Sequence, residues 1–335
     1  MTVLFNSSAP LKVGLIGECM VELQQRPDGS VRQTFGGDTL NTAIYLNRLC
    51  RDSGIVTEYI TAVGEDALSQ AMRECWREEG VGDGRVRVLP DRLPGLYLIQ
   101  TDAHGERNFL YWRGEAAARH CFDGPGAEDL LASLADYGVL YLSGISLAIL
   151  TTEGRERLFG ALAQARSRGS HIVFDNNYRA RLWSDAAHAR TQYEALLAIT
   201  DMALVTWEDD VALFGFETPE QLFRHYADYG VREVVLKRGA RSCLLSTPNG
   251  RAEAMAERVQ RVVDTTAAGD SFSAGYLAAR LLASDPVTAA YWGHRLAGAV
   301  IQHPGALIPL HAMPQMPLPG DGASSQRPRV NCRLR

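Results

Sequence analysis

The sequence predicts an α/β fold in which a mostly parallel sheet is flanked by helices on both faces and carries a small β lid. From about residue 129 onward, apolar runs of strand length alternate regularly with helical patterns, which is typical of βαβ units and a parallel sheet. Before that point, two strand-like runs, Leu96–Thr101 and Arg107–Trp112, surround Ala103-His104-Gly105 and indicate an antiparallel hairpin. The 335 residues are 46% hydrophobic and 22% charged, which suffices to bury a large core.

The individual elements follow from apolar spacing. In the first half, strands are expected at Lys12–Ile16 and Ile60–Val63. Helices are expected at Thr39–Leu49, after two glycines, and from a cap at Asp66 to about Glu79. In the second half, strands separated by helices are expected near Val139–Leu142, His171–Phe174, Met202–Val205 and Glu233–Leu236.

The elements are expected to form one domain over residues 11–312, with segments of the β lid near residues 23–36 and 85–113. After Pro314 the sequence becomes rich in Pro, Gly, Ser and Arg. Residues 313–335 are therefore expected to form a disordered tail.

Charge, hydropathy and cysteine content restrict the function classes. The net charge of −5 gives no global basic field, so we expect no nucleic-acid partner and no binding to a membrane surface. The chain lacks the roughly 18 uninterrupted apolar residues of a membrane-spanning helix, and Met1–Pro10 does not resemble a secretory signal. The six cysteines form no C-x-x-C pair, which favours reduced thiols and a cytoplasmic location.

One stretch indicates an anion site. Small residues from Thr265 to Gly269 directly precede an amphipathic segment, Phe272–Leu282, so unpaired backbone N–H groups are expected at a helix start. A carboxylate at Asp270 would repel a phosphate there, unless it acts on a hydroxyl group beside that phosphate. The alternative is that Asp264 or Asp270 simply caps the helix, and for an isolated string of this kind the cap is the commoner case.

Several catalytic motifs are absent from the sequence. Neither lysine, Lys12 or Lys237, follows a glycine, so there is no Walker A loop. Protein-kinase strings and a G-x-G-x-x-G after a strand are missing too, which argues against protein kinases and nicotinamide oxidoreductases. The eight histidines never pair at metal-ligand spacing.

Two glycine-containing strings stand far apart in the chain, Gly36-Gly37-Asp38-Thr39-Leu40-Asn41-Thr42-Ala43 and Asp264–Asp270. They match the early glycine pair and the late D-T-x-G-A-G-D motif of the ribokinase-like (PfkB) family of carbohydrate kinases, which the chain resembles from about Val13 to Pro309. Four further strings are typical of the members that act on 2-keto-3-deoxygluconate: Leu93-Pro94-Gly95-Leu96-Tyr97, Tyr111-Trp112-Arg113, Leu142-Ser143-Gly144-Ile145-Ser146 and Phe174-Asp175-Asn176-Asn177-Tyr178-Arg179.

The sequence departs from the family pattern at two places. Ala267 stands where the late motif has its first glycine. The N-x-x-E motif, which supports the magnesium–phosphate region, corresponds to Thr206-Trp207-Glu208-Asp209. Either Glu208 or Asp209 could therefore support a metal indirectly, and the sequence does not decide between them.

The resemblance implies an ATP- and Mg²⁺-dependent enzyme that phosphorylates the 6-hydroxyl of 2-keto-3-deoxygluconate. Asp270 would be the catalytic base, and the amides of Ala267, Ala268 and Gly269 would bind the transferred phosphoryl group. Asn177, Arg179, Lys237 and Gly239 would contact ATP, although Lys237 could equally end a strand. The alternatives are a fructokinase or ribokinase, or a catalytically silent sugar-acid binding protein.

The resemblance also implies a set of sugar-binding residues. Arg113 and Arg179 would bind the substrate carboxylate, because a guanidinium matches a carboxylate in a two-point fork. The backbone of Gly36 and Gly37, the side-chain amide of Asn41 and the hydroxyl groups of Tyr97 and Tyr111 would contact the sugar. The glycines could instead belong to an ordinary helix start, and Tyr97 could pack within the hairpin. That hairpin is expected to form a lid over the sugar and to join two subunits in a homo-oligomer.

Overall fold

The computed structural model describes residues 10–26, 28–101 and 107–316. Its main feature is an eight-stranded sheet in the order β14-β13-β12-β11-β10-β9-β1-β4. All neighbours from β12 to β4 run parallel, and β13 and β14 are antiparallel additions at one edge. The strands are β1 (Leu11–Ile16), β4 (Ile55–Ile60), β9 (Val139–Ser143), β10 (His171–Asp175), β11 (Met202–Thr206), β12 (Glu233–Lys237), β13 (Cys243–Thr247) and β14 (Gly250–Ala254). The predicted mostly parallel sheet is confirmed.

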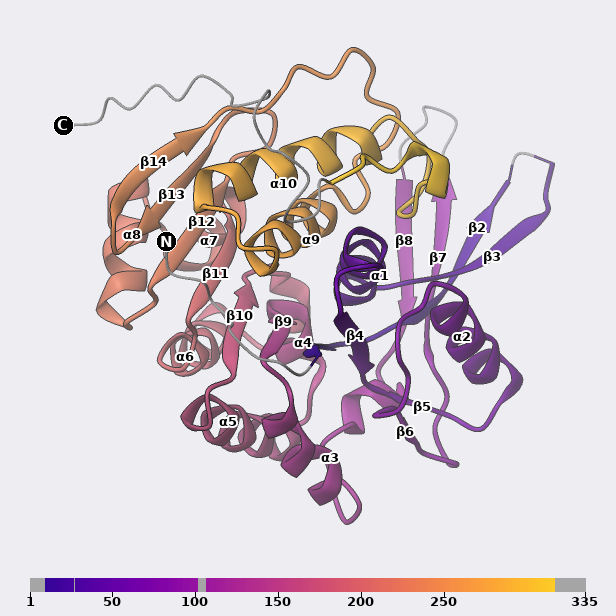
Figure 1. Cartoon of the computed structure of the whole chain (residues 1–335). Helices are drawn as coiled ribbons and strands as arrows, with labels where there is room; N and C mark the ends of the chain where they lie inside the picture. The colour runs from indigo at the N-terminus through magenta and orange to yellow at the C-terminus, as the bar shows by residue number, and fades with distance from the viewer. Residues whose placement is uncertain (1–9, 27, 102–106, 317–335) are drawn as a thin grey trace.

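Helices cover both faces of this sheet, as the sequence predicts (Figure 1). One core layer joins the sheet to α1 (Asp38–Cys50), α2 (Ala67–Glu78), α9 (Ala268–Leu281) and α10 (Pro286–Val300). The other joins it to α3 (Glu128–Ser133), α4 (Gly144–Ile149), α5 (Thr152–Ser167), α6 (Ala186–Leu197), α7 (Trp207–Phe214) and α8 (Pro219–Asp228). Single-turn helices lie at Ala117–His120, Leu134–Asp136, Ala180–Leu182 and Leu310–Ala312.

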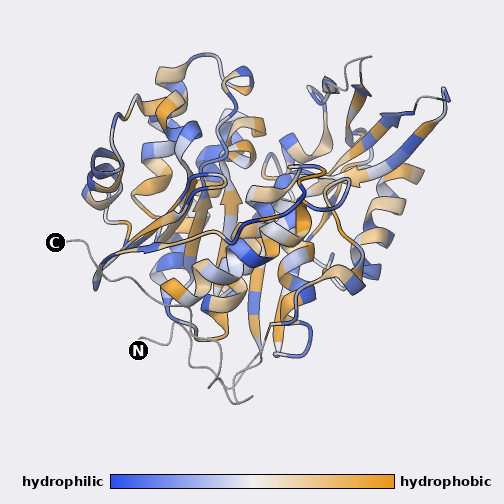
Figure 2. Ribbon diagram, turned by 90° about the horizontal axis from the view of Figure 1, so that it is seen from above, coloured by the Kyte–Doolittle hydropathy of each residue, from blue (hydrophilic) through white to orange (hydrophobic). Residues whose placement is uncertain are grey.

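Successive residues of a strand point to opposite faces, so both faces of each central strand must be apolar. In β1, Val13 and Leu15 belong to the first core layer and Ile16 to the second. Figure 2 shows the same feature as hydrophobic colour along the central strands between the two helical layers.

The predicted hairpin is present in a second, four-stranded sheet of order β3-β2-β7-β8. It contains β2 (Met20–Gln25), β3 (Val31–Gly36), β7 (Gly95–Thr101) and β8 (Arg107–Trp112), with Leu96 opposite Trp112 in the β7–β8 pair. The expected turn at Ala103-His104-Gly105 lies outside the described residues. This small sheet stands beside α1 and α2 (Figure 1).

Some boundaries differ from those expected. The strand expected at Ile60–Val63 is divided, because β4 ends at Ile60 and Ala62–Val63 (β5) pairs instead with Arg87–Val88 (β6). Most of the tail expected at 313–335 lies outside the described residues, and that prediction stays untested. At its beginning, Met313 and Met316 pack against the core. Across the described ranges, no helix combines the length and the apolar character needed to span a bilayer.

Candidate active site

Several predicted site residues lie at the carboxyl ends of the central strands of the large sheet. Asp175, Thr206 and Lys237 are the last residues of β10, β11 and β12, so they lie at the carboxyl ends of adjacent parallel strands. The starts of α1 and α9 reach the same region, because Asn41 and Asp270 are hydrogen-bonded to each other. Ligands of open α/β sheets bind at this edge.

Among the residues that the structure describes, no side chain caps the first turn of α9. Ala267 precedes the helix in a left-handed conformation, with φ 59°, which is the conformation for which glycine is normally preferred. The alternative in which an aspartate merely caps this helix therefore does not hold. Asp264 instead accepts hydrogen bonds from the backbone N–H groups of Thr266 at 3.0 Å and Gly305 at 2.8 Å, and so fixes the loop that enters the helix.

Asp270 lies in that first turn and is held by α1. Its Oδ2 accepts a hydrogen bond from Asn41 Nδ2 at 2.8 Å, and its carbonyl oxygen accepts one from Thr42 Oγ1 at 3.3 Å. Burial and then the neighbouring Asp38 carboxylate raise the pKa of Asp270 to about 8, against the opposing effect of the Asn41 bond. Such a carboxyl group is a stronger base than a solvated aspartate and can accept a proton from an alcohol.

Lys237 is buried beneath the same helix start and is not extended toward solvent. Its Nζ donates to Asp175 Oδ2 at 2.7 Å and to Ser273 Oγ at 3.2 Å. A Cβ atom added at Gly269 would lie 3.8 Å from that Nζ. The lysine charge thus acts from below the backbone that would bind the anion, and Asp175 balances it.

The loop after β10 brings two predicted ATP residues to the site. Asn177 has a left-handed backbone, with φ 24°, and its Nδ2 donates to Asp38 Oδ2 at 2.6 Å. Arg179 pairs with Asp209 at 3.3 Å. Burial raises the pKa of Asp209, and the Arg179 guanidinium opposes that shift. Gly239 follows β12 in a left-handed conformation, with φ 59°.

The acids of α7 differ in their suitability for a metal. Asp210 is fully buried and accepts hydrogen bonds from Asn176 and Tyr226 at 2.9 Å each, so it is a structural group. Glu208 lies 3.8 Å from Arg241 and is largely exposed, and Asp209 is only partly covered. Within the described ranges, no three His, Cys, Asp or Glu side chains group as metal ligands would.

A cavity of about 250 Å³ opens between the small sheet and the loop after β10. Four predicted sugar-binding residues line it: Gly37, Tyr111, Arg113 and Arg179. The other lining residues were not predicted as sugar contacts: Glu18, Met20, Asp38, Ile145, Arg181 and Leu182. Gly36, Asn41, Tyr97 and Asp270 are not among the lining residues. Tyr97 donates its hydroxyl hydrogen to Glu22 and stacks on Tyr111 with ring centroids 5.7 Å apart, as in the packing alternative.

The glycine pair allows close contacts within the protein. A Cβ atom on Gly37 would lie 2.1 Å from the carbonyl oxygen of Glu18, and one on Gly36 would lie 2.8 Å from the Tyr97 hydroxyl oxygen. Any side chain at Gly37 would therefore push the start of α1 away from the β1–β2 turn.

Glu18 is the main lining residue that sequence reasoning missed. It follows β1 directly, is 2% exposed, and forms an ion pair with Arg113. Burial raises the pKa of Glu18, and the Arg113 guanidinium opposes that shift. Its position just after the carboxyl end of the first strand was the available signal, since ligands bind at that edge.

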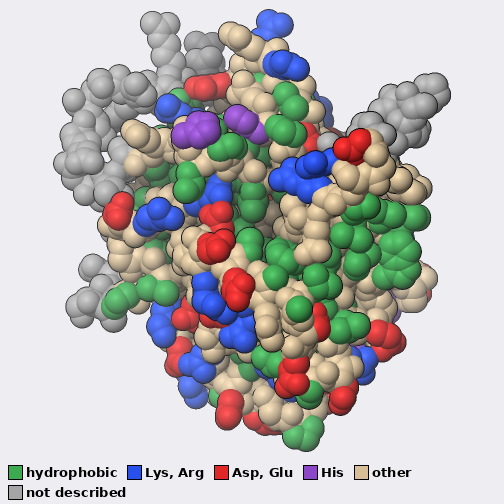
Figure 3. Space-filling model, turned by 90° about the vertical axis from the view of Figure 1, so that its right-hand side faces the viewer, with side chains coloured by type: hydrophobic (Ala, Val, Ile, Leu, Met, Phe, Trp, Pro, Cys, Tyr) green, Lys and Arg blue, Asp and Glu red, His purple; other side chains and the backbone are tan. Residues whose placement is uncertain are grey.

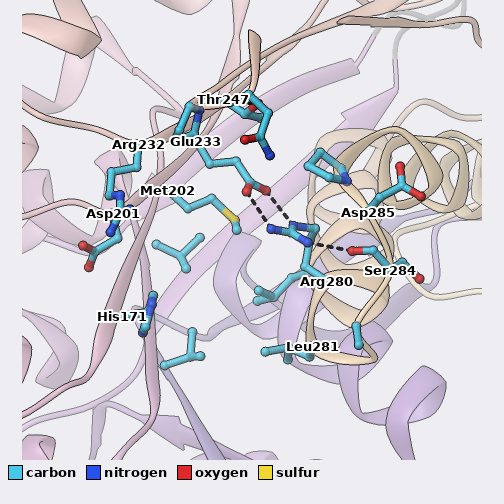
Figure 4. A pocket seen from close by; sticks show the side chains of 17 residues that line it. His171, Asp201, Met202, Arg232, Glu233, Thr247, Arg280, Leu281, Ser284 and Asp285 are labelled. Carbon is cyan, nitrogen blue, oxygen red and sulfur yellow. Dashed lines mark hydrogen bonds and ion pairs between the residues drawn. The ribbon is translucent and has the colours of Figure 1, made fainter. Parts of the chain in front are cut away.

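A second cavity, of about 310 Å³, lies at the opposite edge of the sheet (Figure 4). It is lined by the first residues of β10, β11 and β12, which are His171, Met202 and Glu233, and by the end of α9. The buried acid of this cavity, Glu233, has partners within the protein. It pairs with Arg280 at 2.8 Å and accepts a hydrogen bond from the Tyr276 hydroxyl at 2.6 Å. None of the predicted site residues lines this cavity.

A model of the pfkB family of carbohydrate kinases matches residues 11–313, and the chain belongs to this family. A solved fructokinase from Xylella fastidiosa with bound ATP has a TM-score of 0.77 at 21% identity, covering 91% of this chain and 95% of its own. An Escherichia coli protein solved with ATP and Mg²⁺ has a TM-score of 0.76 at 23% identity, covering 91% and 96%. These structures support the fold alone.

Curated relatives are more similar. The 2-dehydro-3-deoxygluconokinase of Dickeya dadantii is 46% identical over 308 residues, 90% of this chain and 98% of the relative. The enzyme of the same name from Escherichia coli K12 is 45% identical over 306 residues, 90% and 99%. A fructokinase from Klebsiella pneumoniae is 28% identical over 268 residues, 80% and 83%.

Proposed function

We propose that this chain transfers the γ-phosphoryl group of ATP to the 6-hydroxyl of 2-keto-3-deoxygluconate, also called 2-dehydro-3-deoxygluconate. The observation that carries the proposal is Asp270, half-buried at an uncapped helix start and oriented by Asn41 at 2.8 Å, beside a cavity lined by three arginines. The two relatives at 45–46% identity carry the name of this activity.

In the proposed reaction, Asp270 acts as the general base. The substrate 6-hydroxyl oxygen attacks the γ-phosphorus, its proton passes to the Asp270 carboxylate, and the bond to the β-phosphate oxygen breaks to release ADP. The Asn41 bond fixes the carboxylate for this transfer. Backbone N–H groups at the start of α9 would stabilise the negative charge on the phosphoryl oxygens.

We assign the ATP side of the site to the loops after β10 and β12 and to the start of α9. The proposed residues are Asn177, Arg179, Lys237, Gly239, Ala267, Ala268 and Gly269. Lys237 would act from beneath Gly269, where its charge offsets that of Asp175 and favours an anion above the loop. When bound, Mg²⁺ would neutralise charge on the phosphates, and Glu208 or Asp209 would orient its water ligands.

We assign the sugar side to the cavity and its rim. Gly37, Tyr111, Arg113 and Arg179 line the cavity, which supports their assignment as substrate contacts. Asn41 would reach the reacting end through Asp270. For Gly36 and Tyr97 we propose support of the wall, since both are engaged with each other and with Glu22.

The test of this function is ADP release by the purified protein. We expect turnover with 2-keto-3-deoxygluconate to exceed turnover with gluconate, fructose and ribose, and the galacto epimer of the keto acid would measure stereochemical selection. Faster turnover of fructose or ribose would favour the fructokinase or ribokinase alternative. Binding of the sugar acid without any ADP release would favour the silent binding protein.

We also propose that the small sheet acts as the lid over the sugar and that the reaction takes place in the cytoplasm. The cavity is lined by Met20 of β2 and Tyr111 of β8, so a movement of this sheet would open or close it. The described cysteines, Cys19, Cys50, Cys75, Cys121 and Cys243, are all free thiols, which suits a reducing compartment.

A further inference from the structure

The three arginines that line the sugar cavity are not electrostatically equivalent. Arg113 forms an ion pair with Glu18, which is almost completely buried. Arg179 pairs with Asp209 at 3.3 Å. The charge of each is therefore largely balanced by the protein itself before any substrate arrives.

Arg181 is different. It belongs to the single turn Ala180–Leu182, is exposed, and lines the cavity. Its guanidinium carbon lies 4.3 Å from the centroid of the Tyr111 ring, so the side chain rests on a wall of the same cavity. In the part of the chain that the structure describes, Arg181 forms no ion pair.

The cavity lining also contains an acidic group. Asp38 lines the cavity, and its carboxylate contributes to the raised pKa of Asp270. The partner of Asp38 is the neutral amide of Asn177, which does not cancel its charge. A substrate with a carboxylate at one end would be repelled if that end approached Asp38 and Asp270, and attracted if it approached Arg181.

A carboxylate placed against Arg113 alone would also meet Glu18. Both carboxylates would then share one guanidinium, and two like charges at such a distance repel each other. Arg113 can still donate a hydrogen bond to the substrate, but it supplies little net attraction for an anion. The uncompensated positive charge of the cavity lies on Arg181.

We propose that Arg181 is a specificity-determining residue that receives the carboxylate of the sugar acid, and that Tyr111 holds its guanidinium in position for this contact. This inference rests on the proposed function, because it requires an acidic sugar as substrate. The acid end then lies at Arg181 and the 6-hydroxyl end at Asp270, so one contact both selects the substrate and sets its orientation. Neutral sugars gain nothing from this contact.

The test compares Arg181→Gln and Arg181→Lys with the wild-type protein. A matched control is Arg224→Gln, which removes the same charge from an exposed position on α8, away from the cavity. Because Arg181 is exposed, we expect Arg181→Gln to raise KM for 2-keto-3-deoxygluconate by about tenfold, with kcat changed little. The KM for fructose and the thermal unfolding midpoint should not change, and Arg224→Gln should change none of these values.

Two further readouts separate a direct contact from a structural effect. In wild type, KM for the acid should increase with salt, and this dependence should be weaker in Arg181→Gln but retained in Arg181→Lys. Arg181→Lys should recover only part of the affinity, because an ammonium group cannot form the two-point fork. Equal KM changes for acidic and neutral sugars, or an unchanged KM for the acid, would overturn the inference.

Calorimetric binding of 2-keto-3-deoxygluconate to the ATP-free protein keeps this inference distinct from the proposed function. If wild type turns over a neutral sugar best, the proposed function fails. The contact between Arg181 and the carboxylate is still supported in that case if wild type binds the acid about tenfold more tightly than Arg181→Gln, whereas the role of Arg181 in substrate selection fails with the function. Equal binding of the acid by the two proteins rules out the contact itself.

Discussion

At the scale of single residues, Asp270 combines a raised pKa with a position in the first turn of α9. The folded protein therefore binds a proton at this group that the unfolded chain has already released above its ordinary pKa of 3.8. The free energy of unfolding must then fall as pH rises from about 4 to about 8, so the ionised group destabilises the fold at neutral pH. Holding a functional carboxylate in this environment lowers the free energy of unfolding at neutral pH.

Asp270→Asn should lower kcat by at least about a hundredfold, the usual contribution of a general base, while ATP and sugar binding persist. The same change should raise the thermal unfolding midpoint, and the gain should increase between pH 5 and pH 8, because it removes a buried charge. Activity assays and thermal unfolding across that pH range check both expectations. A folded variant with near-normal turnover would show that Asp270 is not the base.

The charges of Arg113 and Glu18 neutralise each other in a largely buried ion pair. Arg113→Ala leaves the Glu18 carboxylate buried without its cation, so it should lower the free energy of unfolding by about 3 kcal/mol at pH 8. The loss should be smaller at pH 5, where Glu18, with its raised pKa, is more readily protonated. Urea unfolding measures both values.

The double variant Glu18→Gln/Arg113→Ala separates this pair from other effects. It should be more stable than Arg113→Ala alone at pH 8, because no unpaired charge remains buried. If the loss of unfolding free energy in the double variant equals the sum of the losses in Glu18→Gln and Arg113→Ala, the two residues are not coupled. A fall in sugar-acid turnover in Arg113→Ala must therefore be corrected for the lost stability before it is assigned to substrate contact.

At the scale of elements, the entry to α9 depends on one strained residue. Ala267 adopts φ 59° because Asp264 fixes the preceding loop to Thr266 and Gly305. A methyl group is unfavourable in this left-handed conformation, and glycine is not. The sequence shows the substitution, and the structure explains why it carries a cost.

Ala267→Gly should raise the free energy of unfolding by about 0.5–1 kcal/mol. Glycine relieves the backbone strain of the folded state, and this gain exceeds the loss caused by the greater entropy of the unfolded chain. Ala268→Gly is the matched comparison, because Ala268 is the first residue of α9 and gains nothing from glycine. That variant should be neutral or less stable. If the two glycine variants behave alike in urea unfolding, the strain at Ala267 is not significant.

At the scale of the whole molecule, the small sheet has two edge strands, β3 and β8, and an apolar surface. Val31, Leu110 and Trp112 on these strands are exposed, and Trp112 is 58% accessible. Figure 3, which views the molecule from the side of this sheet, shows hydrophobic side chains gathered on that face. Unpaired edges and apolar patches of this kind favour association with a second chain.

We expect a dimer at micromolar concentration that buries this surface. Light scattering should give twice the chain mass for wild type, and Trp112→Asp should shift the protein toward monomer by placing a charge in the interface. Leu310→Asp is the control, since Leu310 is exposed outside the small sheet. A monomer at all concentrations would rule out the dimer without affecting the lid.

Apolar patterns in the sequence are enough to predict the architecture, and the small residues before α9 are enough to single out Asp270 as the proposed base. Strands buried on both faces need continuous apolar runs, and βαβ repetition then dictates a parallel sheet, so local patterns sufficed for β9 to β12. Most of β4, together with β13 and the polar β14, lacks a continuous apolar run of this length, and these strands were not predicted. Asp270 was identified because the small residues and the helix that make its environment are its direct neighbours in the chain.

Which side chains meet at the site depends on the folding of distant segments onto one another. Asn41 contacts Asp270 from 229 positions away, Glu18 contacts Arg113 from 95, and Lys237 contacts Asp175 from 62. The spacing of residues within one element specifies which face of that element is buried, but it carries no information about the partner across the fold. Whether an arginine in the cavity is neutralised or free depends on that partner, and so the difference between Arg113 and Arg181 emerged only from the folded chain.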